Sequence, residues 1–423
     1  MNRFKPTRAR VALTVVASSL AGFALRPTRP EHDSSSLSSS GLNPTSFTPF
    51  TLVKKEAVSS SSSLFTLRPT AHPFADTRRG GRRNGSDENV ESPNHDGVWS
   101  VQIKQPQLQI ARDYTPLPPP LQPSSSSSAA AAPASASILS DPPESARSSA
   151  DADANDIRLL IRREHRGEVS NYLHALPPGS TVEVRGSKTE FKLPDDVIDV
   201  VFLAGGTGIA PALQVASALY ARDTERRRIQ GRDISEAKEE GREGQGREGL
   251  GASMVLLWAN RRREDVVGGV SDSVSAGTSG WLAWITGRSR TRSTKDMTED
   301  GTQEQGLIVR QLETLKRART TIDKDGKRHM GLQADYFVDE EGTFLTPSAV
   351  KQAIGSLNAL RPLSHSGSDS RTAGRRLLIV SGPEGFVTYW AGPKQWINGR
   401  EVQGPLGGVL GQIKLDGWEV VKL

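Results

Sequence analysis

The sequence predicts an antiparallel Greek-key barrel followed by a parallel-sheet α/β domain, with a disordered N-terminus and disordered inserts. Two observations indicate this fold class. In the first half, several short segments alternate apolar and polar residues, as antiparallel strands with one buried face do. In the second half, continuously apolar runs alternate with helical patterns, which is the order of a parallel sheet covered by helices. We expect the barrel over about 46–192 and the α/β domain over about 195–423.

The barrel is predicted from several short strands and one short helix. Residues 50–56 (FTLVKKE) and 63–69 (SLFTLRP) read as two antiparallel strands separated by a serine loop. Ser170 is expected to be the N-cap of a helix over 171–176, because its hydroxyl can accept an N–H of the first turn. Many short strands with one small helix are typical of a Greek-key barrel. The other expected strands are 98–104, 157–163 and 181–186.

The α/β domain opens with residues 199–211, DVVFLAGGTGIAP. A strand over 200–204 leads into a glycine loop and then a helix over 212–220, which makes an anion site because free amides and the helix dipole face the ligand. Gly205, Gly206 and Gly208 allow a ligand to approach the backbone, and Pro211 suits a first helical turn. Pro211 stands where the standard dinucleotide fingerprint has its third glycine. A glycine turn without a ligand is the alternative.

The remaining elements of this domain alternate in type and are interrupted by two predicted inserts. Residues 222–251 and 265–299 lack the apolar pattern of a core and are expected to be solvated. Within the second insert, 280–285 (GWLAWI) is an apolar patch that fits contact with a membrane or a partner, or irregular packing. The expected strands are 253–259, 334–339 and 376–380, and the expected helices are 311–318 and 351–360.

Composition excludes several classes of site. The chain has 423 residues but only 35% hydrophobic ones, which fits a folded core of roughly 250 residues with disordered inserts. It has no cysteine, so disulfides, iron–sulfur clusters and thiol nucleophiles are excluded, and its seven histidines show no metal-ligand spacing. The net charge of +6 comes largely from the N-terminus and the inserts, without a basic-aromatic stripe, so we expect no nucleic-acid partner.

The N-terminal residues 1–45 are expected to be a targeting segment and linker. Residues 1–30 are rich in arginine and contain no acidic residue, as in mitochondrial presequences, and they include an uncharged stretch over 11–25. A cleaved presequence, a secretory signal and a short membrane anchor are the alternatives. We favour mitochondrial import, with this segment as an inner-membrane anchor; a soluble protein of the mitochondrial matrix is the alternative.

Residues 112–118 (RDYTPLP) predict a surface for a large, flat, phosphorylated cofactor. On an extended chain Arg112 and Tyr114 project from one face, with Thr115 next to them. They offer a bidentate phosphate partner, a flat ring and a short hydrogen-bonding group. An ordinary strand end before a proline-rich loop is the alternative. The helix start at 167–170 is a second place that can hold phosphate.

The order of these motifs resembles the ferredoxin-reductase-type flavoproteins, and most of all the NADH–cytochrome b5 reductases. The resemblance implies an FAD-binding barrel followed by a Rossmann-like NAD(P)-binding domain. It implies that Arg112 contacts the FAD diphosphate, that Tyr114 lies along the flavin, and that Thr115 sits near flavin N5. The wider FAD motif that it implies comprises Pro116, Leu117, Gly167, Val169 and Ser170. Ser187, where a proline commonly follows the RG pair, is a departure from the family pattern.

The same resemblance implies a nicotinamide site on the second domain. Its residues are Gly205, Gly206, Thr207, Gly208 and Pro211 of the first loop and Gly382, Pro383, Gly385 and Phe386 of the loop after the strand at 376–380. Ser381 stands where the family usually has a cysteine close to the hydride path. Hydride transfer is therefore expected between Thr115 on the barrel and Thr207 with Ser381 on the second domain.

The implied function is that of an FAD-dependent oxidoreductase that passes electrons from NAD(P)H to a one-electron acceptor, namely haem or a haem protein. Residues 260–265 (NRRRED) contain both basic and acidic groups, so NADH and NADPH both remain open as donors, and a plain charged loop is the alternative. The tail over 389–423 is similar to a mitochondrial subgroup, inner-membrane flavoproteins that assist haem attachment to cytochrome c. A generic cytochrome b5 reductase and a non-catalytic FAD-binding assembly factor are the alternatives.

Overall fold

The structure of the protein is a computed structural model. It describes residues 41–70, 96–121, 156–239, 251–273, 304–322, 328–361 and 374–423. The N-terminal segment over 1–40 and the apolar patch over 280–285 lie outside these residues. In the described part of the chain, no helix is long and apolar enough to cross a membrane.

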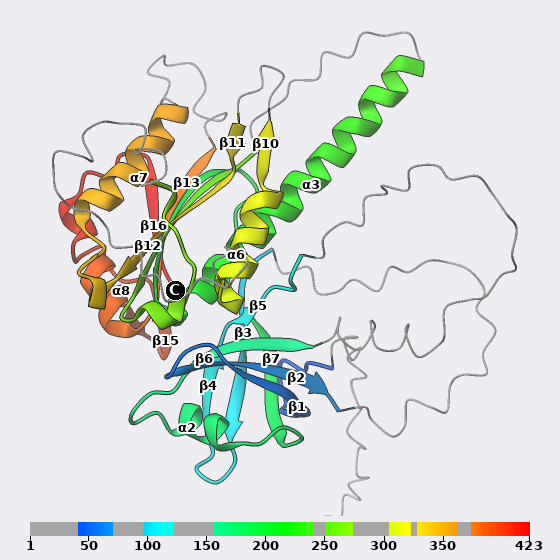
Figure 1. Ribbon diagram of the computed structural model, residues 1–423, viewed down its shortest axis with the longest axis vertical. Coiled ribbons are helices and arrows are strands. Elements are labelled where there is room, and N and C mark those ends of the chain that lie inside the picture. Colours follow the sequence, from blue (N-terminus) through cyan, green and yellow to red (C-terminus); the bar gives the residue numbers. More distant parts are fainter. Residues whose placement is uncertain are drawn as a thin grey trace, which may run out of the picture. The chain divides into compact units, whose positions relative to one another are not determined.

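The first sheet is antiparallel throughout and curves into a barrel (Figure 1). Its strand order is β4-β3-β7-β1-β2-β6-β5, so β4 and β5 lie at opposite ends. Only Thr115 separates these two strands in the chain, so the sheet must curl until its two edges meet. The strands are β1 (Thr48–Ala57), β2 (Ser62–Pro69), β3 (Gly97–Gln105), β4 (Ile110–Tyr114), β5 (Pro116–Leu117), β6 (Ile157–Arg162) and β7 (Thr181–Lys192).

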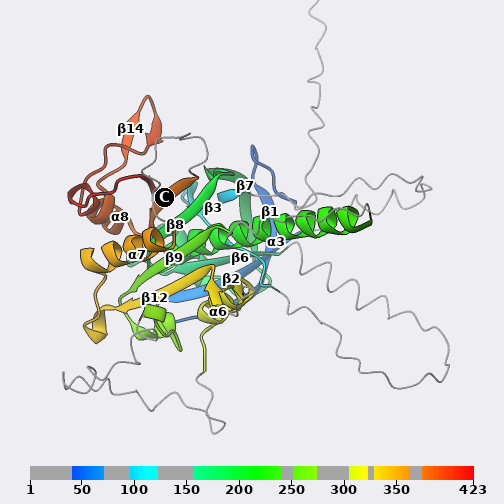
Figure 2. The ribbon, with the colours of Figure 1, turned by 90° about the horizontal axis from the view of Figure 1, so that it is seen from above.

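The second sheet is parallel and has helices on both faces (Figure 2). Alternate residues of its central strand β8 face opposite layers, as the strand period of two requires. Val200 and Phe202 pack under α3 and α6, whereas Val201 and Leu203 pack under α7 and α8. The strands, in sheet order, are β12 (Leu332–Val338), β9 (Ser253–Asn260), β8 (Val197–Gly205), β13 (Arg375–Ser381) and β16 (Trp418–Lys422). The helices are α3 (Ile209–Glu239), α6 (Leu307–Ala318), α7 (Pro347–Leu360) and α8 (Glu384–Ala391).

The predicted fold class, an antiparallel barrel followed by a parallel-sheet domain, is therefore confirmed. The two parts share one hydrophobic cluster, in which Leu64, Leu117 and Leu160 of the barrel join the layer under α3. The Gln214 side chain on α3 accepts from the Trp99 N–H at 2.9 Å and donates to the Pro116 carbonyl at 2.8 Å. Because these contacts are buried, α3 fixes the barrel against the second sheet.

The helix over 171–176 begins earlier than predicted, and the predicted cap is wrong. Helix α2 spans Glu168–Ala175, and its N-cap is Gly167. Ser170 lies inside the first turn, where its hydroxyl donates to the Gly167 carbonyl at 3.1 Å and accepts from the Glu164 N–H at 3.2 Å. The serine therefore braces the loop before the helix instead of capping the helix itself.

The structure also differs from the predicted edges of the inserts. Helix α3 runs to Glu239, well into the insert expected from 222, and Arg228 pairs with Glu225 along it at 2.6 Å. Charge-rich sequence without an apolar stripe was interpreted as an insert, but such i,i+3 pairs support a solvated helix. Asp265, the expected start of the second insert, is buried in the 3₁₀ turn η3 (Arg263–Val266). Leu42, assigned to the N-terminal linker, is buried in the barrel core.

Candidate cofactor-binding site

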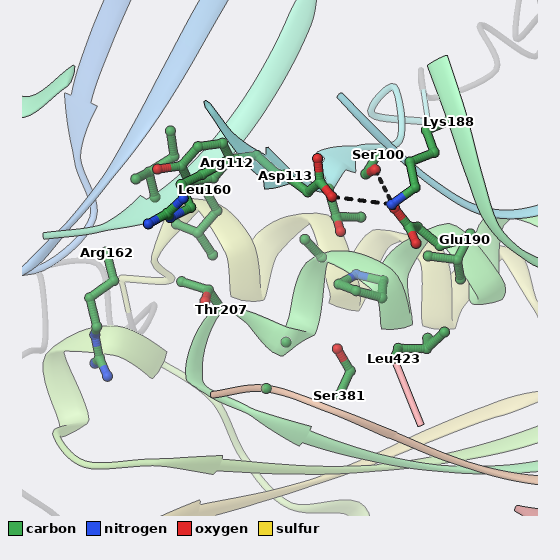
Figure 3. Close-up of a pocket in the computed structure, with 18 of the residues that line it drawn as sticks. Ser100, Arg112, Asp113, Leu160, Arg162, Lys188, Glu190, Thr207, Ser381 and Leu423 are labelled. Atoms are coloured by element: carbon green, nitrogen blue, oxygen red, sulfur yellow. Dashed lines mark hydrogen bonds and ion pairs between the residues drawn. The ribbon is translucent and has the colours of Figure 1, made fainter. Parts of the chain in front are cut away.

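A cavity of about 600 Å³ lies between the barrel and the second domain (Figure 3). Ser100, Arg112 and Asp113 approach it from the barrel, and Thr207, Ser381 and Leu423 approach it from the other side (Figure 3). The predicted site residues on its wall are Arg112, Tyr114, Thr115, Gly167, Val169, Ser170, Thr207, Gly208, Pro211, Ser381 and Gly382. The structure therefore brings together the three residues expected near the hydride path, Thr115, Thr207 and Ser381.

The barrel wall presents an anion cradle. The Arg112 side chain is 58% exposed, and its guanidinium lies 3.9 Å from the Glu168 carboxylate in the first turn of α2. Gly167, Glu168 and Val169 also line the cavity. The first N–H groups of a helix have no partner within the helix, so this helix start and Arg112 can hold a phosphate group from two sides.

Tyr114 lies beside Arg112 on the same wall and is an uncharged aromatic surface. Burial raises the pKa of its phenol to about 12, against a smaller opposing effect of the Arg112 cation. The phenol therefore stays protonated at neutral pH and can act as a hydrogen-bond donor. A flat ring with a polar end suits contact with a planar aromatic group.

The opposite wall is built where two glycine loops meet. A Cβ at Gly208 would lie 2.3 Å from the Ser381 carbonyl oxygen, and one at Gly205 would lie 2.8 Å from the Phe386 ring. Both glycines are therefore needed for the close packing of the loops after β8 and β13. This packing sets Thr207, in the 3₁₀ turn η2 (Gly206–Gly208), and Ser381 side by side at the carboxyl ends of parallel strands, where α/β domains bind ligands.

Seven predicted residues do not lie on the cavity wall. Gly205 and Phe386 pack against each other behind it, and Pro383 is the N-cap of α8. Gly206 faces a second, much smaller cavity, and its carbonyl accepts from the Trp258 indole N–H at 2.9 Å. The others are Pro116 and Leu117, which are buried in β5, and Gly385, which has open space around it.

The sequence analysis missed a charged cluster on the barrel wall. Lys188 on β7 donates to Asp113 at 3.2 Å and contacts Glu190 at 2.9 Å, and Ser100 donates to Glu190 at 2.6 Å (Figure 3). Burial, the largest single influence, lowers the pKa of Lys188, but the charges of Glu190 and Asp113 and the hydrogen bonds that Lys188 donates to them together raise it above its ordinary value. The residues come from three strands, so sequence spacing gives no sign that they meet.

It also missed the wall that the C-terminal tail provides. The tail contributes Lys394, Glu401, Val402, Gln403, Lys422 and Leu423 to the cavity. Lys422 is buried, and its ammonium donates to the carbonyls of Pro393 at 3.0 Å and Pro405 at 2.8 Å. Burial and the nearby Lys394 cation lower the pKa of Lys422.

The charged loop after β9 faces the barrel. Asp265 accepts from Arg162 at 2.7 Å and from the Ser59 hydroxyl at 2.6 Å, and the Arg262 guanidinium donates to the Ser60 hydroxyl at 3.0 Å. The sequence analysis considered the charged groups of residues 260–265 as contacts for a ribose or its 2′-phosphate. In the structure most of these groups instead make contacts within the protein. Asn260, at the end of β9, is buried, and neither its amide nitrogen nor its amide oxygen has a hydrogen-bond partner in the described structure.

The last part of the barrel matches a known protein family. Residues 145–193 match the oxidoreductase FAD-binding domain, and this segment contains β6, α2 and β7. The chain carries an oxidoreductase FAD-binding domain. FAD is therefore the cofactor of this domain, and the cavity wall offers what it needs, since an exposed arginine and a helix start face each other beside an aromatic ring.

Three curated relatives are similar over part of this chain. An uncharacterized FAD-binding protein of Schizosaccharomyces pombe is 28% identical over 42% of the chain and 49% of its own length. The cytochrome c mitochondrial import factor of Saccharomyces cerevisiae is 31% identical over 23% of each protein. NADH-cytochrome b5 reductase 1 of Emericella nidulans is 37% identical over 20% of the chain and 29% of its own length. The chain thus matches half or less of the length of each relative.

Among solved structures, the cytochrome b5 reductase domain of Ulva prolifera nitrate reductase is similar, with a TM-score of 0.37 and 16% sequence identity. The match covers 82% of this chain and 91% of that domain.

Proposed function

We propose that this protein is an FAD-dependent oxidoreductase that accepts hydride from NAD(P)H and passes electrons singly to a haem or a haem protein. The observation that carries the proposal is the cavity, because an anion cradle with Arg112 and Tyr114 faces a loop pair with Thr207 and Ser381 across it. FAD, when bound there, supplies the hydride acceptor and the one-electron donor chemistry, so no acid, base or nucleophile of the chain is required.

The chain's own residues then act by position. Arg112 and the start of α2 would hold the diphosphate of FAD, and Tyr114 would lie along its flavin. Thr115, Thr207 and Ser381 border the space in which a nicotinamide would meet the flavin.

We propose mitochondria, at the inner membrane, as the location, and the N-terminal segment as the attachment. The support is the arginine-rich, acid-free start of the chain and the similarity to the mitochondrial import factor of yeast. Imaging a fluorescent fusion in cells, followed by carbonate extraction of isolated mitochondria, tests both. Full release of the protein by carbonate contradicts the membrane attachment.

Two further functions have support. A generic NADH–cytochrome b5 reductase is favoured by the similarity to the Emericella nidulans enzyme. A non-catalytic FAD-binding assembly factor is favoured by Ser381 in the position of the usual cysteine and by the similarity to the import factor.

Anaerobic mixing of the purified full-length protein with NADH or NADPH separates reductase from assembly factor. A reductase loses the absorbance of oxidised flavin with at least one donor, whereas a flavin that stays oxidised with both donors contradicts the proposal. Regaining the absorbance on addition of a haem protein, with haem reduction, then identifies the acceptor class.

A further inference from the structure

The C-terminal tail contains a hairpin that projects from the second domain (Figure 2). Strands β14 (Gln395–Ile397) and β15 (Arg400–Val402) pair antiparallel through a two-residue turn. The turn residues Asn398 and Gly399 have φ values of 52° and 75°. Positive φ at both positions is the signature of a type I′ turn, which matches the twist of the flanking strands. The hairpin is thus a defined element of the fold.

The base of the hairpin is fixed to the parallel sheet. The Gln403 side chain accepts from the Lys422 backbone N–H at 2.7 Å and donates to the Lys422 carbonyl at 3.0 Å, as a neighbouring strand would. The Lys422 ammonium binds the carbonyls of Pro393 and Pro405, which stand on either side of the hairpin. Strand β16 therefore holds both ends of the hairpin next to β13, the strand that ends at Ser381.

The hairpin carries an unusual concentration of exposed apolar side chains. Of the ten large hydrophobic residues that are exposed in the described part of the chain, five lie between residues 389 and 406. Trp396, at 74%, is the most exposed of all. The others are Tyr389, Ile397, Val402 and Leu406. With the exposed Arg400, the hairpin displays tryptophan and arginine, two of the residue types that dominate binding energy at protein interfaces, and Tyr389 lies nearby in the chain on α8.

The face of the hairpin that carries Trp396 borders the cavity. Trp396 is directly opposite Glu401 in the hairpin, and cross-strand partners share one face. Glu401 lines the cavity and pairs with Lys394, another lining residue, at 3.1 Å. A protein that covers Trp396 would therefore lie at the cavity mouth, where electrons must leave.

We propose that the β14–β15 hairpin is the docking surface for a one-electron carrier protein. The proposal rests on the proposed function, because it names the partner of the same cavity. Each NAD(P)H brings two electrons, and two oxidised carriers take one each in succession, which gives NAD(P)⁺, two reduced carriers and one proton. A small inorganic acceptor enters the cavity without needing the hairpin.

The test separates carrier docking from all other steps. The double variant Trp396→Ser, Ile397→Ser is compared with the wild type and with Phe344→Ser, which removes an exposed aromatic side chain outside the tail. Holoprotein is reduced with one equivalent of dithionite, so a protein that does not accept NAD(P)H can still be tested. Its reoxidation is then followed with ferricyanide, with cytochrome c and with the soluble haem domain of cytochrome b5.

We expect the hairpin variant to lose about tenfold or more in the second-order rate with at least one haem protein. Its ferricyanide rate and FAD content stay as in the wild type, Trp396→Phe retains most of the rate, and Phe344→Ser shows no loss. Unchanged rates with both haem proteins overturn the proposal, as does an equal loss with ferricyanide. If the variant instead loses flotation with anionic vesicles, or loses a dimer in sedimentation, at unchanged carrier rates, the surface binds lipid or a second copy and the proposal also fails.

Discussion

Gly208 has a structural requirement that the sequence pattern alone does not express. The loop was predicted as a ligand cradle, but a Cβ at Gly208 would lie 2.3 Å from the Ser381 carbonyl oxygen. Because glycine has no side chain, the loop after β8 can contact the loop after β13. The pattern GGTGIAP predicted a ligand loop after this strand, and Thr207 and Gly208 of the loop line the cavity, whereas the packing of Gly208 against Ser381, 173 residues later, required the structure.

Gly208→Ala should therefore destabilise the protein by about 1–3 kcal/mol, the usual cost of forcing extra volume into a packed region. The matched control is Gly355→Ala in α7, where a new Cβ meets no atom within 4 Å. In a helix interior that change should stabilise by about 0.5–1 kcal/mol. Thermal unfolding of both variants checks the pair, and equal melting temperatures would show that the loops are not in contact.

His174 makes barrel stability depend on pH. Burial lowers the pKa of its imidazole, with a smaller opposing effect of the Ile161 carbonyl at 3.1 Å. A base whose pKa is lowered in the folded state takes up its proton more readily when unfolded, so stability is lost as the pH falls below about 6.5. Urea midpoints measured between pH 7.5 and 5.5 should fall for the wild type and fall less for His174→Gln. Equal slopes for the two proteins would exclude this contribution.

At the scale of elements, helix α3 follows the glycine loop and also connects the second domain to the barrel. Gln214 on this helix bonds the backbone of two barrel strands, at Trp99 and Pro116. The helix was expected from the periodicity of its apolar residues and from Pro211. The hydrogen bonds to the barrel, however, come from a single buried glutamine among apolar residues. The periodicity of a helix predicts which face is buried, but it does not predict the hydrogen-bond partners of a buried side-chain amide such as that of Gln214.

Gln214→Leu should cost about 1–3 kcal/mol, because it removes the hydrogen bonds of this side chain to the Trp99 N–H and the Pro116 carbonyl in a buried place. Gln107→Leu, at an exposed position, serves as the control. The urea midpoint should fall for the first variant and stay near the wild type for the second. A urea midpoint of Gln214→Leu equal to that of the control would show that the hydrogen bonds of Gln214 do not stabilise the protein.

The β14–β15 hairpin was missed although its signal is in the sequence. Asn398–Gly399 between short segments with apolar residues is the strongest local hairpin signal, since both turn residues must adopt positive φ. The wall that the tail forms could not be foreseen in the same way. This wall depends on the hydrogen bonds that Lys422 donates to the carbonyls of Pro393 and Pro405, and the periodicity of the sequence does not predict such long-range contacts.

At the scale of the whole molecule, the two folded parts are joined by polar as well as apolar contacts. Arg162 of the barrel and Asp265 of the second domain form a largely buried ion pair at 2.7 Å. Both residues are visible in the sequence, but their meeting depends on how the barrel docks against β9. The fold class followed from local patterns, whereas the interface between the parts required long-range geometry.

A double-mutant cycle measures the interaction free energy of the Arg162–Asp265 ion pair. Arg162→Gln and Asp265→Asn should each destabilise the protein, and the double variant should be less destabilised than the sum by about 0.5–3 kcal/mol. Denaturant unfolding followed by fluorescence and by circular dichroism gives the free energies. Strict additivity of the two changes would show that the pair does not couple the parts.

The central claim is that FAD binds in the cavity between Arg112 with α2 on one side and the Thr207–Ser381 loops on the other. The most direct test is the flavin content of the purified full-length protein, measured by absorbance after release, for the wild type, Arg112→Lys and Arg112→Ala. We predict stoichiometric FAD in the wild type, a reduced content in Arg112→Lys because the bidentate contact is lost, and apoprotein for a folded Arg112→Ala. Full FAD occupancy in Arg112→Ala would contradict the assignment of the site.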